Sequence, residues 1–306
     1  MKVVLLSGGG GGARFAHGLR DALPPEDLTI VGNVGDDLEI LGLHVSPDLD
    51  SLLYTLAELF DEKRGWGRAG ETWNALASAA SWGGEDWFRL GDLDLGLHLV
   101  RTEMLRAGVP LSEVTARLVE KTGLGSRILP ATNDRLRTHV HTNAGEFPFQ
   151  EWFVGRAHRD EVDAVRYEGA DDANPAPGVL EALAEAAAIL IAPSNPYLSI
   201  GPILAVKEIR SALGARRASA RSVAVSPLVG GRAVSGPLDR MLSRMAGGTT
   251  PAHVTDCYLG LIDVLVIDES DSPAEADVEL AVTRTLMSDR DAARRLAERA
   301  LEVACG

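Results

Sequence analysis

Short apolar runs alternate with helical patterns over most of the chain. The first two runs, residues 3–6 and 28–31, enclose a glycine-rich turn and a helical pattern, which together are typical of a βαβ unit. Three later runs, at residues 189–192, 222–225 and 264–267, each end at polar residues and are separated by helical patterns. Unbroken apolar runs of this kind are typical of parallel strands buried on both faces. The pattern therefore predicts an α/β fold around a parallel sheet.

Longer helical patterns occupy much of the remaining chain. Leucine and phenylalanine positions between residues 52 and 60 share one face of an expected helix, which two aspartates precede. Two further helical patterns lie between residues 95 and 119, so we expect a mainly helical insertion at about residues 62–130. No repeat or long linker divides the sequence, which predicts a single α/β domain over residues 1–306.

The composition narrows the classes of function. The 306 residues are 45% hydrophobic and carry 30 basic against 44 acidic side chains, giving a net charge of −14 without a basic stripe. Nucleic acid is therefore excluded as a partner, and bound phosphates would need local shielding by backbone N–H groups, a few arginines or a divalent metal. Cys257 and Cys305 lie far apart, which argues against a disulfide framework or a structural zinc site. Because no apolar run reaches about 18 residues, we expect a cytoplasmic protein without membrane contact.

A glycine run follows the first predicted strand. Five consecutive glycines begin at Gly8, and the helix expected after them would aim free N–H groups and a partial positive charge at a phosphate. Gly8, Gly10 and Ala13 also fit the dinucleotide fingerprint. Asp36 or Asp37 would then stand near the position of its ribose-binding acid. A glycine turn that binds no ligand is the other interpretation of the same run.

Two pairs of aspartates form the next candidate group. Asp36 and Asp37 come directly after the second predicted strand, and Asp48 and Asp50 stand at the start of the following helix. Both pairs are expected at the sheet edge that carries the glycine run, because ligands of open α/β sheets bind at the carboxyl ends of strands. Hard carboxylate oxygens at that edge suit Mg²⁺ held jointly by protein and phosphates. Capping of the helix is the alternative role for Asp48 and Asp50.

Aromatic and basic residues supply further candidates. Four of the five tryptophans lie between residues 66 and 87, where their flat faces would suit a ring ligand or would pack the insertion against the sheet. His98 and Arg101 share one helix face, so Arg101 would bind a carboxylate or phosphate, or form a surface salt bridge. His139 and His141 would share one strand face, with no third ligand for a metal.

A polar loop follows the strand expected at residues 189–192. Residues 193–202 include Ser194, Asn195 and Gly201 as well as prolines that stiffen the loop. Their hydroxyl, amide and backbone N–H groups should face the same edge of the sheet as the glycine run. This composition favours a nucleotide or phosphate clamp over a purely structural turn.

Jointly, these motifs resemble those of one known family, and the resemblance runs nearly end to end. The segments that carry it are residues 8–15, 33–37, 47–50, 71–74, 149–152 and 192–204. The chain resembles the phospholactate transferases of coenzyme F-420 biosynthesis, called CofD in archaea and FbiA in mycobacteria. One departure is Gly10, which stands where the family often has a bulkier residue.

The resemblance implies a fold and a reaction. The fold would be Rossmann-like, with three layers around a parallel sheet, usually in a homodimer. A donor that links guanosine diphosphate to a lactyl, enolpyruvyl or glyceryl group and the deazaflavin Fo would meet over Mg²⁺. The terminal ribityl hydroxyl of Fo would attack the phosphorus that bears the three-carbon acid, and GMP would leave. Such a transfer needs mainly positioning and charge neutralisation, which a metal and backbone donors supply.

The same resemblance implies roles for individual residues. Asp36 and Asp50 are expected to bind Mg²⁺ and, with Asp37, to form the catalytic group. Arg101 would hold an acid or phosphate group. The residues expected to contact the nucleotide and its phosphates are Gly8, Gly10, Gly12, Asp48, Ser194, Asn195 and Gly201. The residues expected to border the deazaflavin are Thr72, Trp73 and Asn74.

Two other functions compete with the transferase. A non-enzymatic, nucleotide-sugar-binding regulator of the same fold family should lack the segment at residues 71–74, which this sequence contains. An NAD-dependent dehydrogenase is supported by the glycine fingerprint alone, and no Tyr-x-x-x-Lys motif or catalytic histidine completes it. Among transferase donors, the lactyl, enolpyruvyl and glyceryl groups differ by a few atoms that no motif distinguishes.

Overall fold

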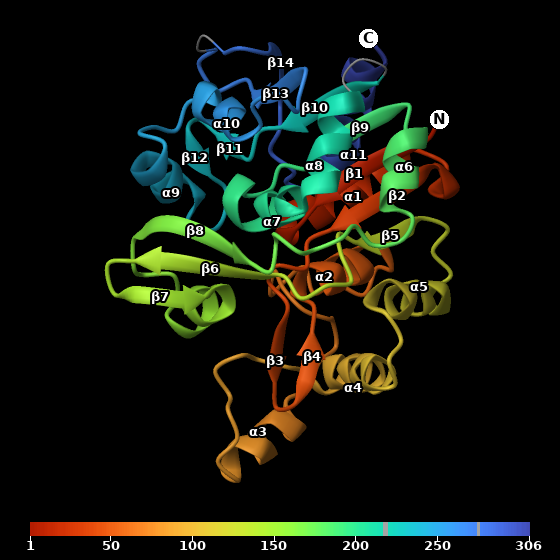
Figure 1. Ribbon diagram of the computed structural model, residues 1–306, viewed down its shortest axis with the longest axis vertical. Coiled ribbons are helices and arrows are strands. Elements are labelled where there is room, and N and C mark those ends of the chain that lie inside the picture. Colours follow the sequence, from red (N-terminus) through yellow and green to blue (C-terminus); the bar gives the residue numbers. More distant parts are fainter. Residues whose placement is uncertain (217–219, 274–275) are drawn as a thin grey trace.

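A parallel sheet forms the centre of the molecule. The computed structural model describes residues 1–216, 220–273 and 276–306, and within them this sheet has seven strands in the order β14-β13-β10-β9-β1-β2-β5. The strands are β1 (Val3–Ser7), β2 (Leu28–Gly32), β5 (Arg127–Pro130), β9 (Ala188–Ile191), β10 (Arg221–Val225), β13 (Val264–Asp268) and β14 (Glu279–Thr283). Every neighbouring pair is parallel, so the carboxyl ends share one edge (Figure 1). The predicted α/β fold around a parallel sheet is confirmed.

Helices cover both faces of the sheet and complete three layers (Figure 1). One layer contains α1 (Gly9–Ala22), α2 (Pro47–Leu56) and α11 (Arg290–Cys305). The other contains α6 (Val179–Glu185), α7 (Gly201–Ala205), α8 (Lys207–Arg216) and α10 (Pro251–Cys257). Helices α1 and α11 approach closely at Gly18, where an added Cβ would lie 2.3 Å from the Ala293 carbonyl oxygen. Buried alanines and leucines of α11 face the sheet, as the amphipathic pattern of the last helix predicts.

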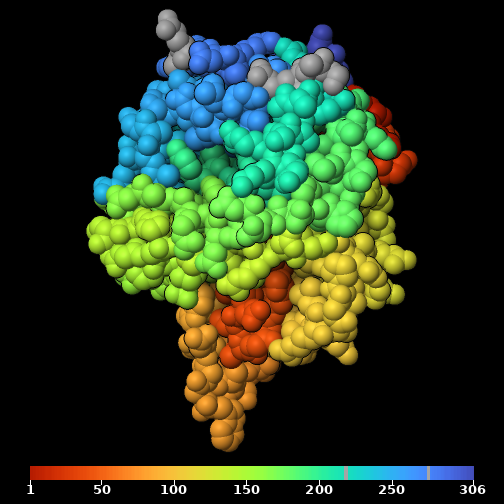
Figure 2. All heavy atoms as spheres, viewed as in Figure 1, coloured from red at the N-terminus to blue at the C-terminus, as the bar shows by residue number. Residues whose placement is uncertain are grey.

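A lobe projects from the sheet on the side of β2 (Figures 1 and 2). It contains the hairpin β3 (Leu38–Ile40) and β4 (Leu43–Val45), then α3 (Asn74–Ser81) and α4 (Asp92–Arg106). Helix α5 (Leu111–Thr122) packs against β5. The interval 62–130, expected to be mainly helical, thus holds three helices and then the edge strand of the central sheet. Helix α3 lies farthest from that sheet.

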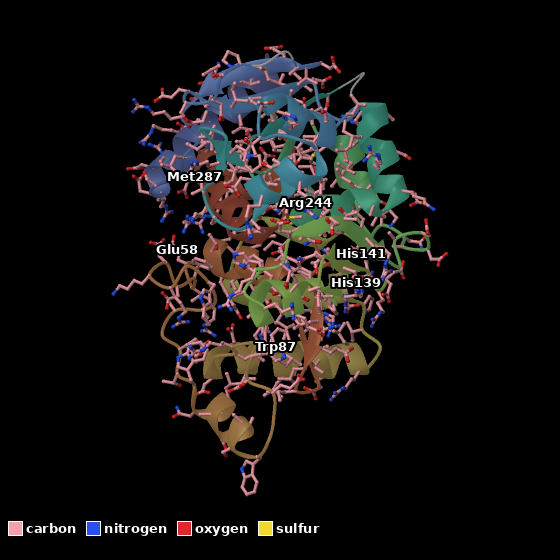
Figure 3. All side chains as sticks on the ribbon, turned by 90° about the vertical axis from the view of Figure 1, so that its left-hand side faces the viewer. Glu58, Trp87, His139, His141, Arg244 and Met287 are labelled. Atoms are coloured by element: carbon pink, nitrogen blue, oxygen red, sulfur yellow. The ribbon has the colours of Figure 1, made fainter. Side chains whose placement is uncertain are left out.

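A second, antiparallel sheet lies beside the carboxyl edge of the first. Its strands are β6 (Arg137–Thr142), β7 (Gly145–Pro148) and β8 (Val162–Glu168), with the short helical turn η2 (Glu151–Gly155) after β7. Val140, Trp152 and Leu198 belong to one buried cluster that joins this sheet to the chain after β9 and to α9 (Leu238–Met245). On the other face of β6 are His139 and His141 (Figure 3). His139 Nε2 lies 3.0 Å from Glu168 Oε2, and His141 Nε2 lies 3.4 Å from Glu146 Oε2.

The remaining short elements are η1 (Pro25–Asp27), η3 (Pro196–Ile200), β11 (Leu228–Val229) and β12 (Arg232–Ala233). Among the described residues, no helix combines the length and apolar character needed to cross a membrane.

Candidate active site

The predicted site residues converge where the strand order of the central sheet reverses. Strands β2 and β5 lie on one side of β1, whereas β9, β10, β13 and β14 lie on the other. The Ser194 hydroxyl donates to the Gly8 carbonyl (2.7 Å), which joins the loop after β9 to the glycine run. The Asn33 amide after β2 donates to Asp48 Oδ2 (2.9 Å) and to the Leu198 carbonyl (3.3 Å). Such a reversal is the usual ligand site of open α/β sheets.

Most of the glycine run belongs to the first turn of α1. The helix begins at Gly9, whose φ of 70° favours glycine, and Gly8 precedes it without a side-chain cap. A Cβ on Gly8 would lie 2.5 Å from Asp48 Oδ2, and one on Gly12 would lie 2.4 Å from Ser7 Oγ. A Cβ on Gly10 would contact nothing within 4 Å. The Gly9 N–H donates to Asp48, and the other N–H groups of this turn are suited to an anion, as predicted for a phosphate loop.

Glycine is required for close packing at Gly12 but not at Gly10. We expect Gly12→Ala to lower the free energy of unfolding by about 1–3 kcal/mol, because the new methyl overpacks the buried contact with Ser7. Gly10→Ala should be neutral or slightly stabilising, because alanine has the higher helix propensity. Urea unfolding of the two variants beside the unmodified protein tests this, and equal stabilities would contradict it.

Asp36 and Asp48 form a buried pair of carboxylates. Both side chains are about 95% buried, and Asp36 Oδ1 has no hydrogen-bond partner among the described residues. Burial raises the pKa of Asp36 well above its usual value, and the nearby charge of Asp48 raises it further. Burial likewise raises the pKa of Asp48 to about 6, although Asn33 and the Gly9 backbone N–H donate to it. Two repelling carboxylates with a free oxygen fit a divalent cation.

The described part of the chain contains no group of three or more His, Cys, Asp or Glu side chains arranged to hold a metal ion. A cation at Asp36 and Asp48 would therefore need further oxygens from substrate phosphates or water, which is the usual mode of Mg²⁺ binding in phosphate-handling sites.

Asp37 contacts the chain that leads into α2. Its Oδ2 accepts a hydrogen bond from Ser46 Oγ (2.9 Å) and lies 3.0 Å from His44 Nε2. These contacts connect the loop after β2 to the chain that enters α2. Asp37 therefore positions the acidic segment, although its Oδ1 remains without a partner among the described residues.

Asp50 and Arg101 form a buried ion pair between α2 and α4. The guanidinium contacts both carboxylate oxygens of Asp50, one of them at 2.9 Å, and lies 3.3 Å from His98 Nδ1. Arg101 and His98 are each 2% exposed, so Arg101 does not form a surface salt bridge. Burial lowers the pKa of His98 to about 4, which leaves its imidazole neutral near pH 7. In this arrangement Arg101 and Asp50 bind each other, and the predicted roles of Arg101 towards a substrate anion and of Asp50 towards a metal stay predictions.

Neither Asp48 nor Asp50 caps α2. The N-cap residue is Ser46, which makes no capping hydrogen bond with its side chain. Both aspartates instead contact partners on other elements, Asn33 and Arg101. The alternative that these aspartates serve only as helix caps is therefore wrong.

The segment at residues 71–74 fastens α3 to α4. Glu71 accepts hydrogen bonds from the backbone N–H groups of Leu93 and Asp94 (both 2.7 Å) in the first turn of α4. Asp92, at the start of α4, in turn accepts from the Thr72 hydroxyl (2.6 Å) and the Asn74 backbone N–H (3.2 Å). Thr72 and Asn74 thus join two helix ends in the lobe. Their predicted contact with the deazaflavin stays a prediction.

Trp73 lies in the same part of the lobe, among cations. The guanidinium carbons of Arg64 and Arg89 lie 4.8 and 4.7 Å from the centre of its ring, and the Trp66 ring lies 5.9 Å away. This arrangement shows tryptophan used for packing within the lobe. The predicted contact of Trp73 with the deazaflavin stays a prediction.

Ser194, Asn195 and Gly201 shape the loop after β9. Asn195 Oδ1 accepts hydrogen bonds from the backbone N–H groups of Tyr197 (2.9 Å) and Leu198 (3.1 Å) and so caps η3. A Cβ on Gly201 would lie 2.0 Å from the Tyr167 hydroxyl oxygen. The structure brings this loop to the glycine run as predicted, while its contact with a nucleotide remains a prediction.

Sequence reasoning missed Arg137, which lies beside the acidic residues. The Thr138 backbone N–H donates to the Gly35 carbonyl (2.8 Å) and so fixes the start of β6 against the loop after β2. Among the described residues, the half-buried Arg137 guanidinium donates to the Leu136 carbonyl (2.8 Å) and has no carboxylate within 4.0 Å. Burial lowers the pKa of Arg137, and the charge of Asp37 only partly offsets this effect. Arg137 belongs to no sequence motif, so only the fold shows that it lies beside the acidic residues.

Comparison with known proteins relates this site to one family. The family model described as 2-phospho-L-lactate transferase CofD matches residues 3–305. The chain is 44% identical to a Streptomyces coelicolor protein named phosphoenolpyruvate transferase, over 99% of this chain and 98% of that protein. Proteins of the same name from Nocardia farcinica and Thermobifida fusca are 42% and 40% identical, over 99% of this chain and 95% and 98% of theirs.

Solved structures share the fold. Protein BH3568 of Bacillus halodurans superposes with a TM-score of 0.66 at 18% identity, over 98% of this chain and 99% of that one. A second structure, described as a UPF0052 family protein from the same organism, gives a TM-score of 0.63 at 19% identity, over 98% of each chain. The match to the CofD model over nearly the whole length, together with relatives at 40–44% identity, shows that this chain belongs to the CofD family of 2-phospho-L-lactate transferases.

Proposed function

We propose that this protein transfers a phosphate-linked three-carbon acid from a guanosine diphosphate-linked donor to the ribityl hydroxyl of the deazaflavin Fo, releasing GMP, in coenzyme F-420 biosynthesis. Family membership over residues 3–305 supports a transferase of this class. The names of the relatives favour the enolpyruvyl donor over the lactyl and glyceryl donors. The observation that carries the proposal is the buried pair Asp36 and Asp48 beside the first turn of α1, at the reversal of strand order.

Mg²⁺ is part of the proposal. The residues present fit such an ion, because Asp36 Oδ1 lacks a partner among the described residues and Asp48 adds a second buried carboxylate. Asp50, the second ligand expected from the sequence, is held by Arg101, so we assign the second position to Asp48. When bound, Mg²⁺ neutralises charge on the phosphates. The homodimer and the cytoplasmic location implied by the family resemblance belong to the same proposal.

The residues of this chain then have separable tasks. The N–H groups at the start of α1 bind phosphate oxygens, and Arg137 binds a further anionic oxygen of the donor. The hydroxyl oxygen of Fo forms a bond to the phosphorus that carries the acid. The bond from that phosphorus to the oxygen of GMP breaks, and the hydroxyl proton is lost to base or water. Positioning and charge neutralisation account for the acceleration of such a transfer.

Product formation tests the proposal directly. Purified protein, Mg²⁺ and Fo are incubated with the guanosine diphosphate-linked enolpyruvyl, lactyl or glyceryl acid in separate tubes, and products are measured by mass spectrometry. We expect the mass of the phosphodiester product and free GMP in the enolpyruvyl tube. No product in any tube, with GDP binding intact, would contradict the transferase and favour a regulatory protein of the same fold.

Arg137 gives a second test of the donor site. We expect Arg137→Met to weaken donor binding about tenfold to a hundredfold, the usual range for hydrogen bonds to charged groups. Because Arg137 repels cations from Asp36, the same variant should bind Mg²⁺ at least as tightly as the unmodified protein. Isothermal titration with donor, GDP and Mg²⁺ measures both effects.

The matched control for this test is Arg166→Met, which removes an exposed arginine of β8 that pairs with Glu146. A loss with the donor alone would place Arg137 on the three-carbon acid, and an equal loss with GDP would place it on a phosphate. Unchanged binding of both ligands would contradict the role of Arg137.

A further inference from the structure

The side chain of Asn33 is buried beside the acidic pair. Asn33 follows β2 directly, and its side chain is fully buried. Its Nδ2 donates to Asp48 Oδ2 (2.9 Å) and to the Leu198 carbonyl (3.3 Å), and its Oδ1 accepts from the Gly35 backbone N–H (2.8 Å). Both donors of the amide and one of its acceptor positions are therefore in use. The mechanism described above gives this side chain no task.

The three partners of Asn33 fix the orientation of its amide. The Gly35 N–H can donate only to an oxygen, so Oδ1 must face Gly35 and the NH₂ group must face Asp48. A flipped amide would place its oxygen against the Asp48 carboxylate and the Leu198 carbonyl, and its NH₂ group against the Gly35 N–H. Only one orientation of the amide satisfies all three partners.

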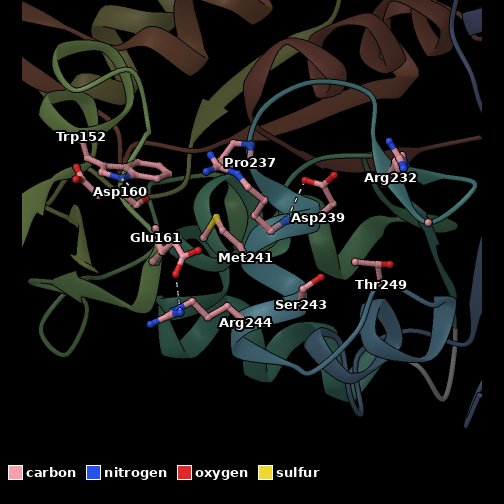
Figure 4. Close-up of a pocket in the computed structure, with 13 residues that line it drawn as sticks. Trp152, Asp160, Glu161, Arg232, Pro237, Asp239, Met241, Ser243, Arg244 and Thr249 are labelled. Carbon is pink, nitrogen blue, oxygen red and sulfur yellow. Dashed lines mark hydrogen bonds and ion pairs between the residues drawn. The ribbon is translucent and has the colours of Figure 1, made fainter. Parts of the chain in front are cut away.

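The Leu198 end of this network is anchored by apolar packing. The Leu198 side chain belongs to the buried cluster that also contains Trp152 and Met241. Trp152 and Met241 in turn line a cavity of about 510 Å³ beside α9 (Figure 4). Because this packing holds Leu198 in place, its carbonyl gives the Asn33 amide a fixed partner. The other amide hydrogen is thereby directed at Asp48.

We propose that Asn33 is a positioning residue for the divalent cation and acts through Asp48; this inference rests on the proposed function. The Asn33 amide and the Gly9 backbone N–H both donate to the Asp48 carboxylate and so hold it in one orientation. A carboxylate has about four lone-pair positions, so acceptor capacity remains for a cation. Loss of a hydrogen bond to a carboxylate that binds metal typically weakens metal binding tenfold to a hundredfold.

An amide suits this position because it donates without carrying a charge. A lysine or arginine beside Asp36 and Asp48 would repel the cation, and an aspartate would add a third carboxylate to two that already repel each other. Burial and the charge of Asp48 raise the pKa of Asp36, and the Asn33 amide opposes this rise. Asn33 thus favours the ionised carboxylates that a cation needs and does not compete with the cation itself.

The test measures binding of Mn²⁺ to the full chain without nucleotide. Mn²⁺ prefers the same oxygen ligands as Mg²⁺, and electron paramagnetic resonance measures the unbound ion. Asn33→Leu has nearly the same shape and removes all three hydrogen bonds. Asn33→Ser is smaller and stays polar, so it serves as the second variant if Asn33→Leu does not fold. We expect both variants to bind Mn²⁺ about tenfold to a hundredfold more weakly than the unmodified protein.

A double variant tests whether Asn33 acts through Asp48. In the Asp48→Asn background, Asn33→Leu should weaken Mn²⁺ binding no further, because the carboxylate that Asn33 positions is already gone. Multiplied losses in the double variant would contradict the proposed route through Asp48.

Asn174→Leu is the matched control. Asn174 is exposed, and its Nδ2 also donates to one carboxylate, of Asp134 (3.2 Å), and to one carbonyl, of Asp172 (3.2 Å). This variant should bind Mn²⁺ as the unmodified protein does. Asn33 variants that are folded by circular dichroism and bind Mn²⁺ within twofold of the unmodified protein would overturn the inference. An unmodified protein that binds no Mn²⁺ would instead contradict the metal of the proposed function, so the two failures are distinguishable.

Discussion

Arg101→Met is expected to lower the free energy of unfolding by about 3–5 kcal/mol, the range for breaking a buried ion pair by removing one partner. The loss arises because the substitution leaves the buried Asp50 carboxylate without its partner. In the unmodified protein burial lowers the pKa of His98, beside the pair, to about 4, so its imidazole adds no positive charge there at pH 7. Urea-induced unfolding at pH 7, followed by circular dichroism, measures the change.

Two further variants separate this effect from a loss of packing. Arg106→Met removes an exposed arginine of the same helix, which donates to the Gly42 carbonyl (2.8 Å), and should cost less than about 1 kcal/mol. The double variant Asp50→Asn with Arg101→Met removes both charges and should be more stable than Arg101→Met alone. If Arg101→Met and Arg106→Met lose equal stability, the ion pair does not anchor α4 to α2.

The fold was predictable where the local pattern decides the structure. Strands β1, β2, β9, β10 and β13 are short apolar runs buried on both faces, and each was expected within about two residues of its observed bounds. The hairpin β3–β4 was not expected, because its strands have three residues each and carry no clear alternation. The helix expected from the apolar positions between residues 52 and 60 begins earlier, at Pro47, and ends earlier, at Leu56, where the chain turns into the lobe.

For the site, the sequence predicts the residues whose position follows from their own segment, but not the contacts between distant segments. Asp36 and the glycine run follow strands, so the rule for carboxyl ends of parallel strands places them correctly. The partner of Asp50 could not be predicted from the sequence, because Arg101 lies on another helix 51 positions along the chain. Arg137 was missed for the same reason, since a contact between β6 and the loop after β2 brings it to the site. Local periodicity carries no information on such pairings.

Replacing Asp36 is expected to separate stability from catalysis. We expect Asp36→Asn to lower kcat by on the order of 10³-fold, comparable to the loss of one group that stabilises charge in a transition state. The same variant should raise the free energy of unfolding by about 1 kcal/mol or more. The gain in stability follows because a pKa raised by burial and by Asp48 means that the ionised carboxylate is destabilised in the folded protein.

Because the pKa of Asp36 is raised on folding, the stability difference between Asp36→Asn and the unmodified protein should depend on pH. The unmodified protein loses stability at Asp36 as the pH rises from the unfolded-state pKa of about 3.9 towards the raised folded-state pKa. Asp36→Asn lacks this loss, so its advantage should vanish near pH 3 and grow as the pH rises towards the folded-state pKa of Asp36. Thermal unfolding at a series of pH values without added metal measures the difference.

Asp37→Asn is the matched control, because it changes the adjacent carboxylate, which accepts from Ser46 and contacts His44. Loss of that hydrogen-bonded charge should lower stability, opposite in sign to Asp36→Asn. Added Mg²⁺ should raise the midpoint of thermal unfolding of the unmodified protein and of Asp37→Asn, but not of Asp36→Asn, because a ligand stabilises only the state that binds it. Equal stabilisation of all three proteins by Mg²⁺ would exclude Asp36 as a ligand, and the loss of activity in Asp36→Asn would then require a different explanation.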